Sequence, residues 1–351
     1  MYTLTPPNDE NSIKKYWKYI DRVYTSCICI TYNQELYIKN TIDSLLSQQT
    51  EYKFEIIVHD DCSSDATRDI LLEYKYKYPN IIKLILQKKN QYSQGKRIFE
   101  IPVKIAQGKY ICLCEGDDYW IDKYKIQKQI KILEKYRNYN ICFTPAKGLK
   151  IKSCNDLSYY KSEITFFTLT NVVEGGGDFM PTASLMIRKH VFDNIPEWCS
   201  KAPVGDYFLQ ILASLNNGAI YIPDFTVVYR ISAIGSWTSL QKKISSEKIM
   251  QFTNDMLFYI DKLYFENKNY IDIETINKAK AIQEINSAYK LIFTGHLELA
   301  KKMIIRSWKR AKSINKKQNL IYFSRNFLFL IYLMMKIKTH IKEYMEIRHS
   351  K

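Results

Sequence analysis

From Ser26 onward, short apolar runs alternate with longer segments whose apolar residues recur at helical spacing. Short runs rich in β-branched residues are typical of buried strands, and the longer period is typical of helices that pack on them. The runs at 26–31, 54–59, 81–86 and 109–114 are the clearest, and helical patterns at 36–48 and 65–78 lie between the first three. This order predicts an open α/β sheet built from βαβ units.

The following residues continue this pattern less regularly. Helices are predicted at 122–136 and 206–216, and the stretch at 147–177 has no regular period. Further strands are predicted at 140–144, 183–187, 219–222 and 226–230. We therefore expect one α/β domain over 24–238, preceded by an N-terminal extension over 1–23, because a chain of 351 residues exceeds a single domain of this type.

Residues 239–351 are predicted to form a basic α-helical region. The patterns at 279–294 and 297–312 flank Gly295 and indicate a helical hairpin. The segment 318–338 has a wide apolar face with basic flanks, which suits either the interface of an anionic membrane or packing against protein. Both interpretations stay open at this point.

Charge and cysteine usage narrow the setting of the protein. The net charge of +16 favours an anionic partner, such as nucleic acid, phospholipid or a phosphate-linked substrate. Cys27, Cys29, Cys112 and Cys114 alternate within strand patterns, which favours buried thiols over disulfides, and Cys-x-Cys lacks the usual zinc spacing. With no signal-peptide pattern over 1–24 and no apolar run of membrane-spanning length, we expect a cytoplasmic protein, soluble or peripheral at the inner face of the membrane.

Two acidic pairs follow predicted strands. Asp60-Asp61 ends the second strand, and Asp117-Asp118 follows the fourth. Ligands of open α/β sheets bind at the carboxyl ends of the strands, where neighbouring carboxylates repel unless a cation compensates them. Mg²⁺ or Mn²⁺ shared with a nucleotide diphosphate is the economical explanation. For the stretch 60–65, a loop that caps the next helix is the alternative.

Three segments together resemble the family 2 glycosyltransferases of GT-A fold. They are Thr31-Tyr32-Asn33, the run from Asp60 to Thr67, and Glu115-Gly116-Asp117-Asp118-Tyr119-Trp120, and the resemblance covers roughly 24–238. It implies a GT-A mixed sheet flanked by helices, followed here by a C-terminal α-helical extension. It also implies an inverting, metal-assisted transfer of a sugar from a nucleotide-diphosphate sugar, expected to be UDP-linked, to a hydroxyl of a glycan or lipid-linked acceptor, as in bacterial surface-polysaccharide assembly.

The resemblance also implies roles for single residues. Asp118 matches the metal ligand, Asp117 the residue that faces the ribose or sugar, and Asp206, after Gly205, the general base. For Asp206, a helix cap stabilised by the helix dipole is the alternative. The positions expected to bind the donor are Thr31, Tyr32, Asn33, Glu35, Asp61, Gly95, Lys96, Asp117, Arg230, Ser236 and Trp237. Among these, Tyr32, Glu35 and Asp61 match positions that hold the nucleobase.

The chain departs from the family near Ser232, where many relatives carry a His that contacts the metal or the diphosphate. Arg230, Ser236 and Trp237 are expected to hold phosphates in its place, with a surface cation and a core aromatic as the alternatives. Acceptor selection is expected from 174–184, whose three consecutive glycines indicate a mobile loop or a close backbone approach. Arg188 is expected to bind an acceptor phosphate or to be a solvated cation at a helix start.

Three other classes compete with this interpretation. A sugar nucleotidyltransferase would need a Gly-rich, basic phosphate loop after the first strand, which Thr31-Tyr32-Asn33-Gln34 lacks. A nucleic-acid-binding protein would explain the charge, but no reader motif is present, so we predict no nucleic-acid partner. A non-catalytic membrane scaffold would suit the C-terminal helices but leaves Asp61, Asp118 and Asp206 unexplained. The sequence pattern specifies neither the donor sugar nor the acceptor, and it leaves homo-oligomerisation open.

Overall fold

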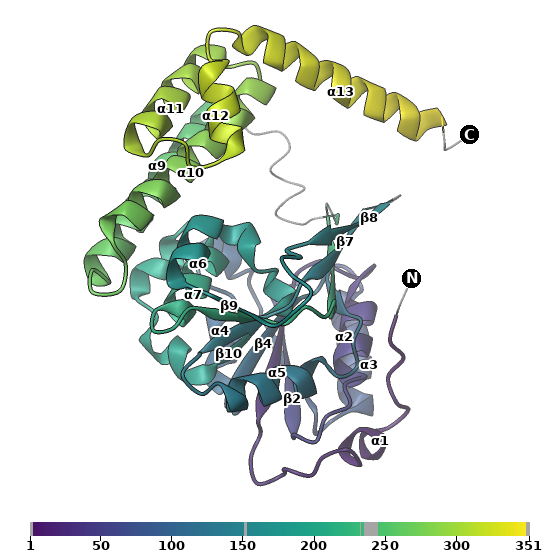
Figure 1. Cartoon of the computed structure of the whole chain (residues 1–351). Helices are drawn as coiled ribbons and strands as arrows, with labels where there is room; N and C mark the ends of the chain where they lie inside the picture. The colour runs from purple at the N-terminus through teal and green to yellow at the C-terminus, as the bar shows by residue number, and fades with distance from the viewer. Residues whose placement is uncertain (1–2, 151–152, 232, 235–244, 349–351) are drawn as a thin grey trace. The chain divides into compact units, whose positions relative to one another are not determined.

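The computed structural model describes residues 3–150, 153–231, 233–234 and 245–348 of the chain (Figure 1). The chain divides into two compact units, Met1–Lys242 and Lys243–Lys351. The boundary predicted between residues 238 and 239 lies outside the described residues.

The first unit is built on an eight-stranded mixed sheet of order β3-β2-β1-β4-β10-β6-β11-β9. The first four strands of this order are parallel, and β10 runs antiparallel to both of its neighbours. The predicted α/β sheet is therefore confirmed, in the mixed form. Its strands are β1 (Thr25–Thr31), β2 (Phe54–Asp60), β3 (Ile82–Leu86), β4 (Tyr110–Glu115), β6 (Ile141–Phe143), β9 (Thr165–Phe167), β10 (Met186–Arg188) and β11 (Ala219–Tyr221).

Helices flank this sheet (Figure 1). In α2 the buried Ile38, Ile42 and Leu45 recur at helical spacing, so one face of the helix packs on the strands while the other stays polar. The same apolar cluster contains Cys27 and Cys112, which are cross-strand partners in β1 and β4, and all eight cysteines are free thiols. The helices of this unit are α1 (Glu10–Lys14), α2 (Ile38–Leu46), α3 (Thr67–Lys77), α4 (Glu100–Ile105), α5 (Lys125–Lys135), α6 (Leu169–Gly175) and α7 (Gly205–Ser214).

A second, four-stranded sheet has the order β5-β12-β7-β8. Its strands are β5 (Tyr119–Trp120), β7 (Ala146–Lys150), β8 (Ser153–Leu157) and β12 (Val227–Arg230). The stretch 147–177 thus contains regular elements that the sequence pattern did not reveal. The strand predicted at 183–187 begins only at Met186, because Thr182–Ser184 form a 3₁₀ turn after Pro181.

The second unit consists of helices, as predicted. They are α9 (Ser246–Glu266), α10 (Ile273–Phe293), α11 (Leu297–Arg310), α12 (Lys316–Phe323) and α13 (Leu328–Arg348). The helical hairpin is confirmed, since α10 and α11 flank Gly295, whose φ of +87° suits glycine.

The single helix predicted at 318–338 is wrong, because the chain leaves the helix between α12 and α13. Ile321 and Leu328 are buried among residues of α10 and α11. Leu320, Phe323 and Phe327 expose 69%, 70% and 64% of their surface. Within the described ranges no helix combines the length and apolar character needed to cross a bilayer.

Candidate functional site

The ends of β1, β2 and β4 bring the predicted motifs together. Thr31 lies opposite Asp60 in the register of β1 and β2, and Ile30 lies opposite Glu115 in that of β1 and β4. The loops that follow are tied to the same edge, since the Asp61 N–H donates to the Thr31 carbonyl at 3.0 Å. The carboxyl ends of these parallel strands therefore form one site, as expected for an open α/β sheet.

Gly116 is required by the approach of this loop to β1. A Cβ at this position would lie 2.7 Å from Thr31 Oγ1 and 2.9 Å from Thr31 Cβ. Any side chain would therefore push β1 and β4 apart. The close approach that glycine permits at this position is therefore to Thr31.

Asp118 is a buried carboxylate with one oxygen left without a partner. The side chain is 1% exposed, and its Oδ1 accepts a hydrogen bond of 2.9 Å from the backbone N–H of Arg230. Its Oδ2 is buried and has no hydrogen-bond partner among the described residues. Burial, followed by the charges of Asp117 and Glu115, raises the pKa of Asp118 well above its usual value. A buried, half-satisfied carboxylate of this kind is stabilised by a cation.

Asp117 and Glu115 lie beside it. Burial raises the pKa of Asp117, against the opposing effects of the Arg230 charge and of a hydrogen bond from the Gln34 side chain. The pKa of Glu115 is raised to about 8, first because the surrounding protein displaces water from its carboxylate and then because of the charges of Asp117 and Asp206. Since water also reaches Glu115, screening weakens the repulsion that it feels. Because the charge of Asp206 acts on Glu115, the predicted base lies near the acidic motif.

Asp206 lies in the first turn of α7 and faces this cluster. Its Oδ2 accepts a hydrogen bond of 3.1 Å from the Thr182 hydroxyl, and its Oδ1 accepts one of 2.9 Å from the Tyr207 N–H. Burial raises the pKa of Asp206. The N-cap position belongs to Val204, so Asp206 is not the residue that caps the helix, although it does accept one N–H of the first turn.

Arg230 connects the second sheet to the acidic motif. Pairing of β12 with β5 sets Val228 opposite Tyr119, directly after Asp118. The guanidinium donates to the backbone carbonyl of Asp117 and to Asn40 Oδ1, and it lies 4.5 Å over the Tyr119 ring. Arg230 therefore supplies positive charge at the carboxylates. Ser232, Ser236 and Trp237 lie outside the described residues.

Asp61 holds a loop in this structure. The side chain is fully buried, and its two oxygens accept the N–H groups of Gln91 and Tyr92 at 2.6 and 3.0 Å. Each carboxylate oxygen of Asp61 can accept a second hydrogen bond, so both could still accept one from a ligand. The side chain is fully buried, however, so neither oxygen is exposed to solvent in this structure. The nucleobase contact of Asp61 stays a prediction.

Asn33 and Glu35 join the loops that follow β1 and β2. Asn33 Oδ1 accepts from the Ser64 N–H at 2.8 Å, and Glu35 Oε2 accepts from the Ala66 N–H at 2.8 Å. Asn33 adopts a φ of +52°, a conformation that Asn tolerates better than most residues. These contacts support the loop part of the alternative for 60–65, whereas the N-cap of α3 is Ala66, without a side-chain cap hydrogen bond. Tyr32, which is 47% exposed, remains open to a ligand.

Arg97 is a residue of this site that sequence reasoning missed. Its side chain is 7% exposed and Nη1 donates to Glu100 at 2.9 Å, while Nη2 is buried without a partner in the described part of the chain. A Cβ on Gly205 would lie 3.4 Å from this Nη2, so the guanidinium lies beside the start of α7 and Asp206. The sequence signal that could have indicated Arg97 is its position directly after Gly95 and Lys96, which were predicted to bind the donor.

Gly95 and Lys96 form the turn before Arg97. Gly95 has a φ of +73°, which ends the 3₁₀ turn Tyr92–Gln94. The Lys96 ammonium donates to Gln91 Oε1 at 2.7 Å and the residue is exposed. Gly95 and Lys96 are therefore surface residues of the loop that Asp61 anchors.

The predicted acceptor region is packed more tightly than expected. A Cβ on Gly175 would lie 2.4 Å from the Phe179 ring, which supports the close-approach interpretation of the glycine run. Both interpretations of Arg188 are wrong, because it is buried and donates to the carbonyls of Tyr139 and Leu133 at 2.9 and 2.6 Å. It satisfies backbone groups at the ends of neighbouring elements, a role that only the fold reveals.

Comparison with known proteins identifies this domain. Residues 26–195 match the model of glycosyl transferase family 2. This segment, slightly less than half of the chain, is therefore similar to glycosyl transferase family 2. The family 2 segment contains Asp61, Asp117 and Asp118 but ends before Asp206.

Sequence relatives include proteins with and without named activities. An uncharacterized protein of Mycobacterium tuberculosis is 32% identical over 219 residues, a match that covers 61% of this chain and 60% of that protein. The chain thus spans about three fifths of the length of the mycobacterial relatives that it matches. The Escherichia coli enzyme WfaP, named UDP-Glc:alpha-D-GlcNAc-diphosphoundecaprenol beta-1,3-glucosyltransferase, is 39% identical over 123 residues, which are 33% of this chain and 46% of WfaP.

Solved structures show the same fold. Staphylococcus aureus TarS 1–349 in complex with UDP-GlcNAc matches with a TM-score of 0.59 at 19% identity and covers 86% of this chain and 91% of TarS 1–349. The mannosyltransferase PcManGT of Pyrobaculum calidifontis, in complex with GDP-Man and Mn²⁺, matches with a TM-score of 0.53 at 12% identity over 91% of this chain and 90% of PcManGT. The family 2 domain therefore has the GT-A fold that its sequence predicts.

Proposed function

We propose that this chain is an inverting glycosyltransferase that moves a sugar from a nucleotide-diphosphate sugar to a hydroxyl of a glycan or lipid-linked acceptor. The observation that supports this most strongly is the buried Asp118 Oδ2, for which the described residues offer no partner, beside two further carboxylates at the strand ends of a domain that matches family 2. The complex of TarS with UDP-GlcNAc and the UDP-Glc named for WfaP support a UDP-linked donor.

The residues at this site fit Mn²⁺ or Mg²⁺. Both ions prefer carboxylate and phosphate oxygens, and they usually keep positions for the substrate. Among the described residues no three His, Cys, Asp or Glu side chains form a complete metal cage, so Asp118 would share such an ion with the donor phosphates. When bound, the ion would supply Lewis-acid stabilisation of the departing diphosphate.

Asp206 is proposed as the general base. In an inverting displacement the acceptor hydroxyl loses its proton as it attacks the anomeric carbon, so one well-placed carboxylate suffices. The Thr182 hydroxyl holds one oxygen of Asp206 at 3.1 Å and fixes the orientation of the carboxylate. Burial raises its pKa, which moves the group toward the range in which a base is most effective.

The donor is proposed to lie across the ends of β1, β2 and β4. Tyr32 and the loops joined by Asn33 and Glu35 would contact the nucleoside, with Thr31 below them and Asp61 holding the neighbouring loop. Asp117 would face the ribose or the sugar. Arg97 is buried beside Asp206, and its Nη2 has no partner in the described ranges, so it could offset phosphate charge; we add it to the positions predicted from the sequence.

The remaining predicted donor contacts stay proposals. Gly95 and Lys96 would approach the donor from the loop that precedes Arg97. Arg230 would add charge near the phosphates, although its guanidinium is occupied by Asp117 and Asn40 in this structure. Ser236 and Trp237 are proposed only from the resemblance.

A thermal-shift titration tests the donor site directly. UDP and GDP are added to the full chain with Mn²⁺ and, separately, with EDTA, because the two solved neighbours were bound to different nucleotide sugars. We expect stabilisation by UDP only with Mn²⁺, and a smaller effect of GDP. Indifference to both nucleotides in the presence of Mn²⁺ would contradict the proposal.

We also propose that the chain works peripherally at the cytoplasmic face of an anionic membrane. The exposed Leu320, Phe323 and Phe327 accompany Lys316 and Lys317 of α12, a combination of apolar and basic groups that suits anionic lipid.

Vesicle co-sedimentation tests this proposal. Phe323→Ser with Phe327→Ser should release the protein from vesicles that contain phosphatidylglycerol. Phe258→Ser with Phe265→Ser, at 55% and 65% exposed positions of α9, is the matched control. If both double variants bound the vesicles equally, the surface around Phe323 and Phe327 would not be the membrane contact.

A further inference from the structure

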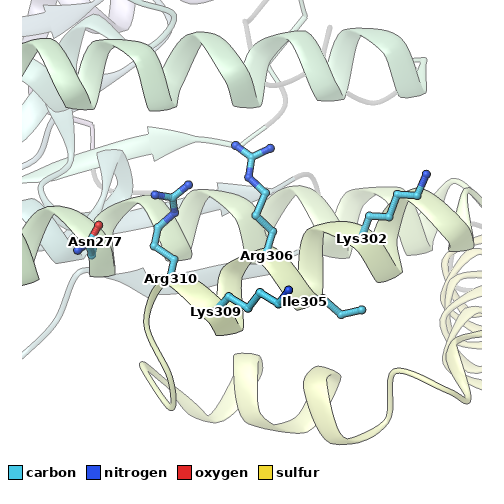
Figure 2. A pocket seen from close by; sticks show the side chains of 6 residues that line it. All are labelled: Asn277, Lys302, Ile305, Arg306, Lys309 and Arg310. Carbon is cyan, nitrogen blue, oxygen red and sulfur yellow. The ribbon is translucent and has the colours of Figure 1, made fainter.

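A basic pocket lies on the second unit, between α10 and α11. It is an open depression of about 670 Å³ lined by Asn277, Lys302, Ile305, Arg306, Lys309 and Arg310. In Figure 2 the side chains of Lys302, Arg306 and Arg310 project to the same side of α11, and Asn277 lies at the Arg310 end. The spacing of four residues between these cations places them in one row along the helix.

A fully buried carboxylate orients two of these cations. Glu284 of α10 is 0% exposed and its Oε1 accepts from Arg306 Nε at 2.6 Å. Both Glu284 oxygens also accept from Arg310, from Nη2 at 3.0 Å and from Nε at 3.1 Å. Each guanidinium has five N–H groups, so both keep donors that Glu284 does not use. The side chains of Arg306 and Arg310 remain 43% and 25% exposed, which leaves those donors accessible to a ligand.

The pocket carries more positive charge than the fold requires. Glu284 is one carboxylate, and one of the two arginines would be enough to neutralise it. Lys302 and Lys309 are exposed, and no ion pair of the described residues involves either of them. The four cations that line this pocket repel one another, and an anion bound among them would relieve this repulsion.

We propose that this pocket is an anion site for a phosphate or diphosphate group, separate from the site at the strand ends of the first unit. Arginine guanidinium groups held in a fixed orientation recognise phosphate oxygens through paired N–H donors, and lysine adds charge without such geometry. The Asn277 amide offers a further neutral donor. The phosphate would come from a soluble ligand or from a lipid headgroup. The inference does not depend on sugar transfer by the first unit.

The test compares two double variants that each lose two positive charges. Lys302→Gln with Lys309→Gln removes two pocket cations and leaves the Glu284 contacts intact. Lys301→Gln with Lys312→Gln removes two lysines from the same part of the chain outside the pocket lining. Calorimetric titration of the full-length chain with inorganic diphosphate is done in EDTA, so that no divalent ion brings diphosphate to Asp118.

We expect saturable diphosphate binding that is about tenfold weaker in the pocket variant and changed by less than about twofold in the control. Phosphatidylcholine vesicles with and without phosphatidylglycerol form the second arm, and a selective loss of vesicle binding by the pocket variant assigns the site to lipid headgroups. Equal losses in both double variants would reduce the effect to bulk charge and overturn the proposal. Unchanged binding in the pocket variant, in both arms, would also overturn it.

Discussion

The two units of the chain gather charges of opposite sign and compensate them differently. In the first unit, Glu115, Asp117 and Asp118 crowd together at the strand ends, and burial raises the pKa of each. In the second unit, two arginines contact Glu284, and each of its oxygens accepts at least one hydrogen bond from them. The acidic cluster is only partly compensated by the described residues, which leave Asp118 Oδ2 without a partner, whereas the buried acid of the second unit has two arginine partners.

This difference predicts opposite responses to the loss of a carboxylate. A carboxylate that is repelled by its neighbours and half-satisfied costs free energy in the metal-free fold, and a bound cation would compensate it. A buried carboxylate with two guanidinium partners stabilises its own unit, and its removal leaves those cations without a counter-charge. Function should therefore depend on the first cluster and stability on the second.

The largest expected effect is that of Asp118→Asn. The amide keeps the shape of the side chain but removes the negative charge that would hold a divalent ion, so we expect transfer to fall by about a thousandfold or more. The Mn²⁺-dependent stabilisation by UDP should disappear with it, as measured by thermal shift. Asp156→Asn, an exposed β8 carboxylate paired with Lys147, is the matched control and should be nearly silent.

Asp206→Asn should be almost as severe for turnover but not for binding. Loss of the base is expected to lower kcat by about a hundred- to ten-thousandfold, while donor affinity stays close to that of the parent chain. Steady-state kinetics and UDP titration separate the two effects. A parallel loss of donor affinity would instead mark Asp206 as a binding residue.

Glu284→Gln tests the buried carboxylate of the second unit. The amide cannot neutralise Arg306 and Arg310, so we expect the second unit to lose about 1–3 kcal/mol of unfolding free energy, a range reduced by the exposure of both arginines. Urea unfolding followed by hydrogen exchange of α10 and α11 amides measures this. Metal-dependent UDP binding should be unaffected. A neutral result would show that the pocket cations do not need Glu284.

The sequence predicts the fold wherever the apolar residues of a segment recur with a single period. The strands β1 to β4 and the hairpin of α10 and α11 follow from apolar patterning, since their core faces repeat regularly. The stretch 147–177 was not predictable, because β7 and β9 are short strands that join different sheets through pairing with the distant β12 and β11. The break between α12 and α13 was missed because Phe323 and Phe327 keep helical spacing across the polar run Ser324-Arg325-Asn326.

The sequence predicts those site residues whose positions depend only on the order of the strands. Asp61, Asp117 and Asp118 follow strand ends, and parallel strands bring such residues to one edge. Arg97 and Gln34 were missed because their contacts depend on how loops fold back, which no periodicity encodes. The tertiary structure also decided Arg188, whose buried contacts with backbone carbonyls resemble nothing in the local sequence.

The smallest effect, and the one that most sharpens the comparison, is expected from Glu115→Gln in the metal-free protein. With a folded pKa of about 8 against the usual value of 4.5, Glu115 binds a proton more readily in the folded chain, so the unfolding free energy falls as pH rises from about 4.5 to about 8. Glutamine removes this group from the titration. The variant should therefore gain stability over the parent chain at pH 8 and show no gain at pH 4.

Screening by water limits that gain to about 1 kcal/mol, and hydrogen exchange of β1 and β4 amides at the two pH values measures it. Because Asp117 and Asp118 have raised pKa values as well, the variant should keep part of the pH dependence. A loss of stability at pH 8 would mean that the ionised Glu115 is already compensated inside the protein. The acidic cluster would then resemble Glu284, and its need for a cation would fall on Asp118 alone.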